Sequence, residues 1–535
     1  MTDAPAEFER LRTRLADVGG LKNALAVLFW DQNTYMPPAG AAARGEACAT
    51  VEGLIHRAIA DPEVGRLLVR LESWAGGLAP DDDRRLEVDV VRRDHEKAVR
   101  VPERLLADIA RSSALGQQAW MEAREARDYG RFRDALALQI EQRREYSACF
   151  PAFAHPYDAL VDDFEPEMTV AQLRPLFADL TAELTPLVAA AAGPADPPFP
   201  PSVDVATQRA ALMDVLEGVG FDARSWRLDV SVHPFAQSPG MGDLRVTTDF
   251  REHEMSFAIY SGLHEFGHAL YEAGVRGRPD PGVLEEAVSL GVHESQSRMW
   301  ENLVGRSRPF CEWVVPVLNR HLGGALEVDG FHRALNSVTP SLIRTEADET
   351  TYNLHVALRF ELETALFEGT LAVDELPDAW DAGMLRLLGV EVLDVNQGVL
   401  QDIHWGCGMI GYFPTYTLGN LLAAQMWERV RTDLPDLDEA LARGDFAPLR
   451  EWLLVNVHRL GRRHLPRELA RRVTGREVSS RPFLDYLRSK LSAAGVIVPA
   501  ALGTAGATPP SESGTPVTAG SGLSAPPAGG TPAAA

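Results

Sequence analysis

Residues 264–268 of this 535-residue chain read His-Glu-Phe-Gly-His, which matches the pattern H-E-x-x-H. Because residues four apart lie on one face of an α-helix, His264 and His268 share a face only if this stretch is helical. The flanking sequence agrees, since apolar residues recur there at three- and four-residue spacings, at Phe257, Tyr260, Leu263, Phe266 and Leu270. We therefore predict a buried helix through residues 257–270, with Gly274 as its C-terminal stop.

Two histidines on one helical face form a common ligand pair for a divalent metal ion. A catalytic zinc site needs a third protein ligand and keeps one position open for water. A second helical run, predicted from near residue 284 to beyond residue 299, offers Glu294. Gly291 and Ala287 precede Glu294 by three and seven residues, so small residues on this stripe would let the two helices approach closely. We predict that Glu294 is the third ligand beside the two histidines.

Glu265 directly follows His264, and a carboxylate there can act as general base towards a water on the metal. The surroundings of Glu294 leave alternatives open. Arg298 lies one helical turn further on, and an ion pair with Arg298 would give Glu294 a structural role instead. His293 points about 100° away from Glu294 on a helix, so we expect it to support the site or pack beside it rather than bind the metal.

A short β structure is predicted just before the metal-binding helix. Alternating apolar residues at 228–232 indicate one strand, residues 238–242 read Ser-Pro-Gly-Met-Gly and indicate a turn, and residues 244–248 indicate a second strand. We predict a small hairpin that leads into the helix. An exposed strand edge can bind the extended backbone of a peptide substrate; the alternative is a purely structural hairpin.

Several further motifs follow in a fixed order along the chain. His-Glu-Phe-Gly-His followed by His-Glu-Ser-Gln at 293–296 resembles the thermostable carboxypeptidase (carboxypeptidase Taq) family of zinc peptidases, over roughly residues 10–500. The matching segments are Trp30-Asp31, Met36-Pro37-Pro38, His233-Pro234-Phe235, residues 243–247 (Asp-Leu-Arg-Val-Thr), residues 343–348 (Ile-Arg-Thr-Glu-Ala-Asp) and residues 398–405 (Gly-Val-Leu-Gln-Asp-Ile-His-Trp). The resemblance implies a large, mainly α-helical peptidase domain with a deep active-site groove, and a homodimer.

A carboxypeptidase must recognise the free C-terminal carboxylate of its substrate, and the planar fork of an arginine binds carboxylates with two hydrogen bonds. The resemblance points to Arg344 for this role, with Arg245 as the second candidate. The alternative for Arg344 is an i,i+4 ion pair with Asp348, which would share its helical face. Both contacts are compatible, because Asp348 could orient the arginine.

The tetrahedral oxyanion needs a hydrogen-bond donor beside the metal. His404 and Tyr412 are the candidates, with Tyr416 behind them, and His233 is a further candidate for substrate contact. Residues 406–419 are rich in glycine and aromatic residues, so we predict a loop that lines the groove. The alternative for His404 is structural: a hydrogen bond to Asp402 or an anchor for its neighbour in the chain.

Composition excludes several other classes of protein. The formal net charge of -24 argues against a nucleic-acid or anionic-membrane partner. No apolar run reaches the length of a bilayer span, and no signal segment opens the chain, so a cytoplasmic location is expected. The four cysteines, at 48, 149, 311 and 407, form no C-x-x-C pair and are expected to be free thiols.

The chain is predicted to be helical from residue 7 to 192 and again from 376 to 497, with a proline-rich break at 193–201. From about residue 503 the sequence is mostly Ala, Gly, Pro, Ser and Thr, which cannot bury enough apolar surface to order itself. We therefore divide the chain into a helical metallocarboxypeptidase domain, 1–500, and a disordered tail, 501–535.

The predicted function is hydrolysis of the C-terminal peptide bond, which releases single amino acids. Zn²⁺, or Co²⁺ as a substitute, is held by the three ligands with water in the fourth position, and Glu265 takes that water's proton. The substrates are peptides with a free C-terminus. One alternative is a zinc endo- or dipeptidyl-peptidase of the same helical architecture. Another is a non-catalytic zinc scaffold, against which the presence of Glu265 argues.

Overall fold

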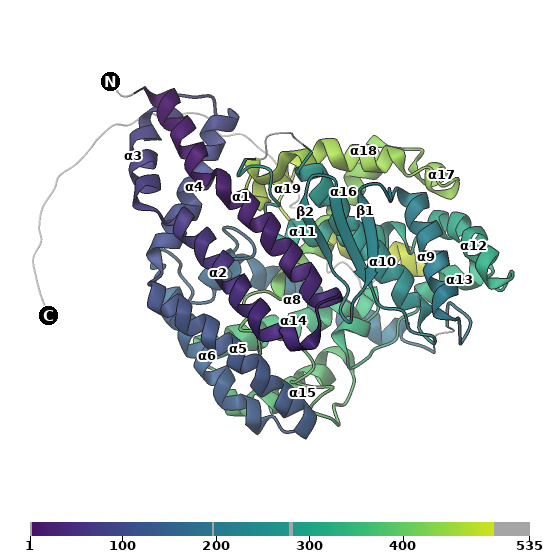
Figure 1. Cartoon of the computed structure of the whole chain (residues 1–535). Coiled ribbons are helices and arrows are strands. Elements are labelled where there is room, and N and C mark those ends of the chain that lie inside the picture. The colour runs from purple at the N-terminus through teal and green to yellow at the C-terminus, as the bar shows by residue number, and fades with distance from the viewer. Residues whose placement is uncertain (1–2, 195–196, 278–281, 497–535) are drawn as a thin grey trace, which may run out of the picture. The chain divides into compact units, whose positions relative to one another are not determined.

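The N-terminal region of the computed structural model is built from helices (Figure 1). Several of them begin at an aspartate cap. The structure describes residues 3–194, 197–277 and 282–496. Asp3, Asp61 and Asp82 each accept a backbone N–H at the start of a helix, which satisfies a group that the helix itself leaves unpaired. The helices are α1 (Ala4–Thr34), η1 (Pro38–Gly40), α2 (Ala41–Ile59), α3 (Pro62–Gly76), α4 (Asp83–Arg100), α5 (Glu103–Ala126), α6 (Gly130–Ala148), α7 (Asp158–Asp162), α8 (Val170–Ala191) and α9 (Val205–Val219). The predicted helical region 7–192 is confirmed.

Helices α1, α3 and α4 pack on an apolar cluster of their own, separate from the main core. Its members are Phe8, Leu11, Val64, Leu67, Leu68, Leu71, Ala75, Val88 and Val91. Ion pairs then join these helices to segments far along the chain: Lys22 with Glu286 at 2.5 Å, Asp94 with Arg462 at 2.7 Å and Asp83 with Arg463 at 2.9 Å. The second cluster, the main core, runs from Val101 to Leu491 and surrounds the elements that carry the predicted metal ligands.

The β structure is a three-stranded sheet rather than a single hairpin. Its strands are β1 (Trp226–Val230), β2 (Ala236–Gly240) and β3 (Asp243–Thr248), in the order β1-β3-β2. Only β2 and β3 form a hairpin, while β1 runs parallel to β3. The predicted pairing was therefore wrong, because part of the expected turn forms the edge strand β2. Pro239 is tolerated there, since an edge strand need not donate every N–H to the sheet. The sheet packs on α10 and α1.

Helix α10 (Met255–Val275) contains residues 264–268, so the predicted metal-binding helix is confirmed. It continues through Gly274, which lies against His458 instead of ending the helix. The second helix, α11 (Leu290–Arg298), begins later than predicted. Ser289 caps it by accepting the N–H of Val292 at 3.1 Å, so Ala287 lies outside the helix. A π-helical segment, η2 (Met299–Val304), follows α11 directly.

Helix α11 is enclosed between α10 and α16 (Pro414–Asp433). A Cβ added to Gly267 would lie 2.5 Å from the backbone oxygen of Gln296, and one added to Gly419 would lie 2.6 Å from Cβ of Glu294. Both glycines therefore allow a helix approach that any other residue would block. The position of Glu294 is thus fixed by backbone packing on two sides.

The remaining elements complete the main core: α12 (Arg308–Leu322), α13 (Val328–Leu335), η3 (Arg344–Glu346), α14 (Glu349–Glu368), η4 (Val373–Glu375), α15 (Leu376–Leu388), α17 (Leu437–Ala442), α18 (Ala447–Asn456), η5 (His458–Arg463), α19 (Pro466–Thr474) and α20 (Arg481–Ala493). Residues 389–413 contain neither helix nor strand. The predicted loop at 406–419 is only half correct, since Pro414 is the first residue of α16, a favoured place for proline.

Three other predictions concern the chain as a whole. All four cysteines are free thiols, as expected. Within the described ranges, no helix is both long enough and apolar enough to cross a membrane. The predicted disordered tail, 501–535, lies outside the described residues.

Candidate metal centre and active site

Three side-chain atoms converge between α10 and α11: Nε2 of His264, Nε2 of His268 and Oε2 of Glu294. The carboxylate oxygen lies 3.6 Å from His264 Nε2 and 3.4 Å from His268 Nε2, and all three atoms lie within 4.8 Å of one another. Ligands bound at about 2.0–2.2 Å in tetrahedral geometry stand about 3.4 Å apart. The structure thus brings together the three residues predicted as ligands, at a spacing that fits one zinc-sized ion.

Both histidines are oriented through their other ring nitrogen. His264 Nδ1 lies 2.8 Å from Oε2 of Glu301. His268 Nδ1 lies 2.5 Å from Nδ1 of His293, whose Nε2 in turn lies 3.0 Å from Oε1 of Glu272. In the tautomers that satisfy these contacts, each ligand histidine donates from Nδ1 and leaves the Nε2 lone pair free for a metal. His293 therefore supports a ligand, as its direction on the helix predicted.

Sequence reasoning missed Glu301 and Glu272, although a signal for both exists. Glu272 follows His268 by four residues, and Glu301 follows Glu294 by seven, so each shares a helical face with a predicted ligand. Carboxylates that hold the second nitrogen of a metal-binding histidine are common. A search for acids at these spacings would have found both.

Glu294 makes the ion pair that was the alternative to metal binding, but with only one of its oxygens. Arg298 Nε donates to Oε1 at 2.7 Å, while Oε2 faces the two histidines. Burial alone would raise the pKa of Glu294, but Arg298 and the histidines together hold it well below the usual range. The carboxylate is therefore ionised at neutral pH, as a metal ligand must be. Arg298 also donates to Glu301 at 3.0 Å and so links two parts of the site.

Glu265 is buried, with 6% of its surface exposed. Burial raises the pKa of Glu265 to about 7, with His264 opposing this shift and the charge of Glu294 adding to it. A carboxylate with a pKa near the working pH is well suited to take a proton and later release it.

Arg344 does not pair with Asp348, so the i,i+4 ion pair that was the alternative to substrate contact is not formed. Asp348 instead caps α14 by accepting the N–H groups of residues 350 and 351. The guanidinium of Arg344 donates Nε and Nη2 to Oδ1 of Asp402, at 3.1 and 2.7 Å, and Nη1 to the hydroxyl of Tyr352 at 2.9 Å. Arg359 donates to the other oxygen of Asp402 at 2.6 Å. One carboxylate therefore binds two buried arginines.

Asp402→Asn should destabilise the fold by about 3–5 kcal/mol, because it leaves two buried guanidinium groups without their anion. Burial raises the pKa of Asp402, but Arg344 and Arg359 outweigh this and hold it far below the usual range. The stabilisation is therefore complete above about pH 4 and is lost as the pH falls. Denaturant unfolding of both proteins from pH 7 to pH 3 checks this. The difference in free energy of unfolding between the wild type and Asp402→Asn should narrow by about 1.4 kcal/mol per pH unit below pH 4. A difference that stays constant over this range would contradict the prediction.

His404, Tyr416 and Tyr412 form a chain of polar groups beside the metal ligands. His404 Nε2 lies 3.2 Å from the hydroxyl of Tyr416, which shares a hydrogen bond with Tyr412. Burial lowers the pKa of His404 to about 3, so its ring is neutral at physiological pH. The predicted hydrogen bond to Asp402 is not formed, since His404 Nδ1 and the carboxylate are 3.8 Å apart. Burial raises the pKa of Tyr412 to about 12, and the charge of Glu294 adds to this shift.

The remaining predicted substrate contacts, His233 and Arg245, lie on the sheet side. His233 is exposed in the connection between β1 and β2. Arg245 is 14% exposed, pairs with Asp243 at 2.7 Å and lies 4.2 Å from the centroid of the Trp30 ring. The contact with Trp30 joins the sheet to α1. Arg245, the second candidate for the carboxylate anchor, therefore has a structural role.

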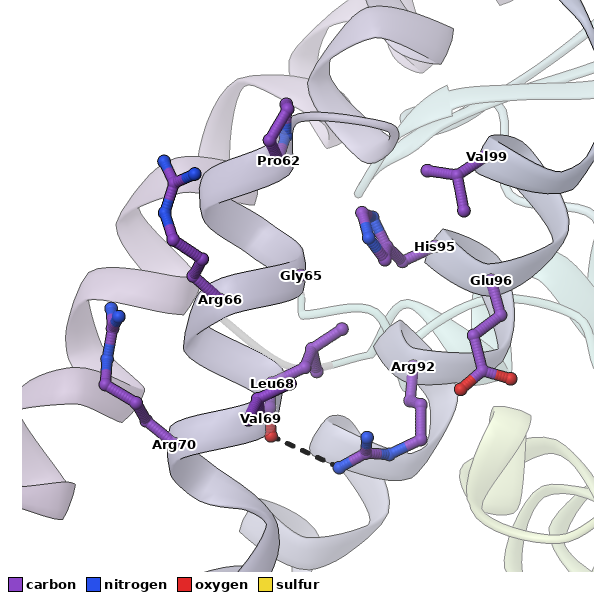
Figure 2. Close-up of a pocket in the computed structure, with 10 residues that line it drawn as sticks. All are labelled: Pro62, Gly65, Arg66, Leu68, Val69, Arg70, Arg92, His95, Glu96 and Val99. Carbon is purple, nitrogen blue, oxygen red and sulfur yellow. Dashed lines mark hydrogen bonds between the residues drawn. The ribbon is translucent and has the colours of Figure 1, made fainter.

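A separate pocket of about 620 Å³ lies between α3 and α4 (Figure 2). Its lining includes Val69, His95 and Val99, and Arg92 donates to the backbone oxygen of Leu68 at 3.2 Å. None of the ten residues that line it belongs to the candidate site. The pocket is therefore not the place where the predicted chemistry occurs.

The chain matches a family model and several characterised sequences over nearly its whole described length. The model described as Carboxypeptidase Taq (M32) metallopeptidase matches residues 10–491. The chain is 40% identical over 502 residues to Thermostable carboxypeptidase 1 of Thermus thermophilus. The matched region covers 91% of this chain and 97% of that protein. It is 34% identical over 492 residues to Thermostable carboxypeptidase 1 of Pyrococcus furiosus, which covers 90% of this chain and 98% of that protein.

Solved structures show the same architecture. The crystal structure of M32 carboxypeptidase from Deinococcus radiodurans R1 matches with a TM-score of 0.86 and 38% identity, over 92% of this chain and 100% of that one. Metallocarboxypeptidase 1 of Trypanosoma cruzi matches with a TM-score of 0.85 and 31% identity, over 91% of this chain and 99% of that one.

Proposed function

Because the chain belongs to the carboxypeptidase Taq (M32) family of metallopeptidases, and is thus a metal-dependent carboxypeptidase, we propose how its own residues perform that reaction. Zinc is the proposed metal, with cobalt as a substitute, held by His264, His268 and Glu294. The supporting observation is that the three ligand atoms converge while Nδ1 of each histidine is engaged elsewhere. Two imidazole nitrogens and one carboxylate oxygen suit zinc better than magnesium or calcium.

The proposed mechanism assigns proton transfer to Glu265 and oxyanion binding to Tyr412. A bound zinc ion would supply Lewis acidity, which polarises the scissile carbonyl and lowers the pKa of a coordinated water. Glu265 takes a proton from the attacking water and passes it to the leaving amine. The Tyr412 hydroxyl donates a hydrogen bond to the oxyanion, and His404 and Tyr416 hold that hydroxyl in place.

A peptide blocked at its N-terminus tests the proposed reaction most directly. Incubation with the zinc-loaded protein should give a ladder of single losses from the C-terminus, read by mass spectrometry. Glu265→Gln protein, purified in the same way, controls for contaminating peptidases. Internal cuts or two-residue losses would support the endo- or dipeptidyl-peptidase alternative, which the family does not favour. Absence of cleavage with metal bound would point to the scaffold alternative.

Arg344 is the proposed anchor for the substrate carboxylate. Its contacts with Asp402 and Tyr352 use three of the five guanidinium N–H groups, which leaves donors for a second carboxylate. Arg344→Ala should lower kcat/KM for peptides with a free C-terminus by about 10–100-fold, the value of a charge-assisted hydrogen bond of about 1.5–3 kcal/mol. Amidated peptides should be much less affected. An equal loss on both substrates would remove Arg344 from the anchor role, and the thermal midpoint of the variant controls for the lost Asp402 pair.

Four wider expectations stay predictions. They are a homodimer, a cytoplasmic location, a deep substrate groove and binding of the substrate backbone to an edge of the sheet. Sedimentation equilibrium of the full chain tests the first. Crosslinking of a peptide that carries a photoreactive group near its C-terminus tests the last two, since the labelled residues should come from the sheet and from the segment 398–416.

A further inference from the structure

Two buried carboxylates take no part in the proposed reaction, yet each contacts the backbone or side chain of an element that does. They are Glu165, which is 4% exposed, and Glu363, which is 1% exposed. Among the described residues neither carboxylate forms an ion pair, although the charge of Arg359 acts on Glu363 from a greater distance. Burial raises the pKa of both to about 7. A buried carboxylate without a cation costs stability, so its presence calls for a reason.

Glu165 lies at the N-terminus of α11, the helix that carries Glu294. Its Oε2 accepts the N–H of Gly291 at 3.0 Å, and its carboxylate also accepts the Ser289 hydroxyl. The preceding residue, Phe164, accepts the N–H of Leu290 through its backbone oxygen at 3.0 Å. The carboxylate thus satisfies N–H groups that a helix start leaves unpaired and favours the positive end of the helix dipole. These contacts fix α11 one turn before the metal ligand.

Glu363 lies on α14 and fixes the irregular segment that carries His404 and Tyr412. Its Oε1 accepts Trp405 Nε1 at 2.6 Å, and its Oε2 accepts the N–H of Gly411 at 3.0 Å. Trp405 directly follows His404, and Gly411 directly precedes Tyr412. Since residues 389–413 contain no helix or strand to define their shape, two bonds to one carboxylate hold both catalytic candidates.

The two carboxylates are joined through one short segment, residues 157–165. Tyr157 at its start donates its hydroxyl to Glu363 Oε2 at 2.5 Å, and Glu165 stands at its end. Between them, the ring of Phe164 packs edge-on against Tyr412 at 5.1 Å. The segment is itself anchored, since Asp162 pairs with Arg93 at 2.7 Å and with Lys97 at 2.9 Å. Residues 157–165 therefore contact both α11 and the segment that carries His404 and Tyr412.

A carboxylate is required at both positions because of the number of donors that converge there. Glu363 accepts three donors with two oxygens, whereas a glutamine would turn an N–H₂ towards at least one of them. The same holds at Glu165, where the N–H of Gly291 and the Ser289 hydroxyl both need an acceptor.

We propose that Glu165 and Glu363 are positioning residues, which hold the metal-binding helix α11 and the His404–Tyr412 segment at a fixed separation through residues 157–165. This inference rests on the proposed function, because it takes Glu294 as a ligand and Tyr412 as the oxyanion donor. It assigns different consequences to the two carboxylates: Glu165 acts on the metal ligand, and Glu363 acts on the transition-state contacts.

The test separates metal affinity from turnover in isosteric variants of the full chain. Glu165→Gln should weaken zinc binding by about 10–100-fold, measured by competition with a chromophoric chelator. Glu363→Gln should keep the zinc affinity but lower kcat by about 10–100-fold with KM little changed. Glu167→Gln and Glu361→Gln are matched controls, since both side chains are exposed near the two positions, and both should behave like the wild type.

Further variants provide a test if the first ones do not fold, and a reference for the loss of a metal ligand. Should Glu165→Gln or Glu363→Gln fail to fold, Glu165→Asp and Tyr157→Phe serve instead. The first shortens the reach of the carboxylate and leaves the Ser289 cap intact, and the second removes one donor from Glu363. They should shift zinc affinity and kcat, respectively, in the same directions. Glu294→Gln serves as the reference for a lost ligand. If Glu294→Gln keeps full zinc affinity, the proposed function is wrong. If it loses affinity while zinc affinity in Glu165→Gln and kcat in Glu363→Gln equal the controls, the positioning role is overturned.

Discussion

Replacing Glu265 with glutamine should lower kcat on peptide substrates by about 10²–10⁴-fold, the usual contribution of a general base. Glutamine has the shape of the carboxylate but cannot take the proton of the attacking water. The side chain lies outside the set of converging ligand atoms, which are those of His264, His268 and Glu294. Zinc affinity should therefore stay within a few-fold of the wild type, and the loss should fall on kcat and kcat/KM alike.

The chain offers a matched control for this substitution in residues 253–254, where His-Glu begins the same pattern without completing it. Glu254 is exposed and pairs with Arg251 at 2.7 Å, so Glu254→Gln should leave kcat unchanged. Steady-state kinetics and metal analysis on the same preparations check both variants. Full activity in Glu265→Gln protein would assign the proton transfer to another group.

Removal of the metal should abolish activity, and zinc or cobalt should restore it. The ligand set of two imidazoles and one carboxylate matches the preference of both ions, whereas magnesium prefers octahedral oxygen ligands and should restore little. Activity after dialysis against a chelator, followed by stoichiometric addition of each ion, measures this. Activity that survives complete removal of the metal would contradict the whole mechanism.

The same experiment has a second readout in stability. The ion pair of Glu294 with Arg298 and the Nδ1 contacts of both histidines are made within the protein and need no metal. The fold should therefore persist, while the thermal midpoint falls because the metal binds only the folded state. Cooperative unfolding at a lower temperature is the expected result, and loss of secondary structure at 25 °C would show instead that the metal is required for folding.

The parts of the site that sequence reasoning found are those encoded by local spacing. His264 and His268 are one helical turn apart, and Glu294 was found because buried acids on a helical stripe need a partner. The helices of the first 192 residues were likewise clear from periodicity. Helix starts were less certain, since the cap at Ser289 depends on a single hydroxyl, and residues 284–288 have apolar content similar to that of a helix.

The parts that sequence reasoning missed depend on contacts between distant segments. Arg344 and Asp402 are 58 residues apart, and Glu363 and Tyr157 are 206 apart, so no spacing rule connects them. The alternative pairing of Arg344 with Asp348 assumed a regular helix, but a cap at Asp348 begins a new helix there. The parallel pairing of β1 with β3 was missed because β2, which lies between them in the sequence, was read as part of a turn.

The long-range ion pairs of the N-terminal helices have a consequence for synthesis. The buried members of the small apolar cluster shared by α1, α3 and α4 all lie between positions 8 and 91, so this cluster can form early in synthesis. Their partners Arg462 and Arg463 come much later, and Asp94 and Arg462 are separated by 368 positions. At about 5–20 residues per second, this delay is roughly 20–70 s. The N-terminal helices can therefore form their own apolar cluster well before their ion-pair partners Arg462 and Arg463 are translated.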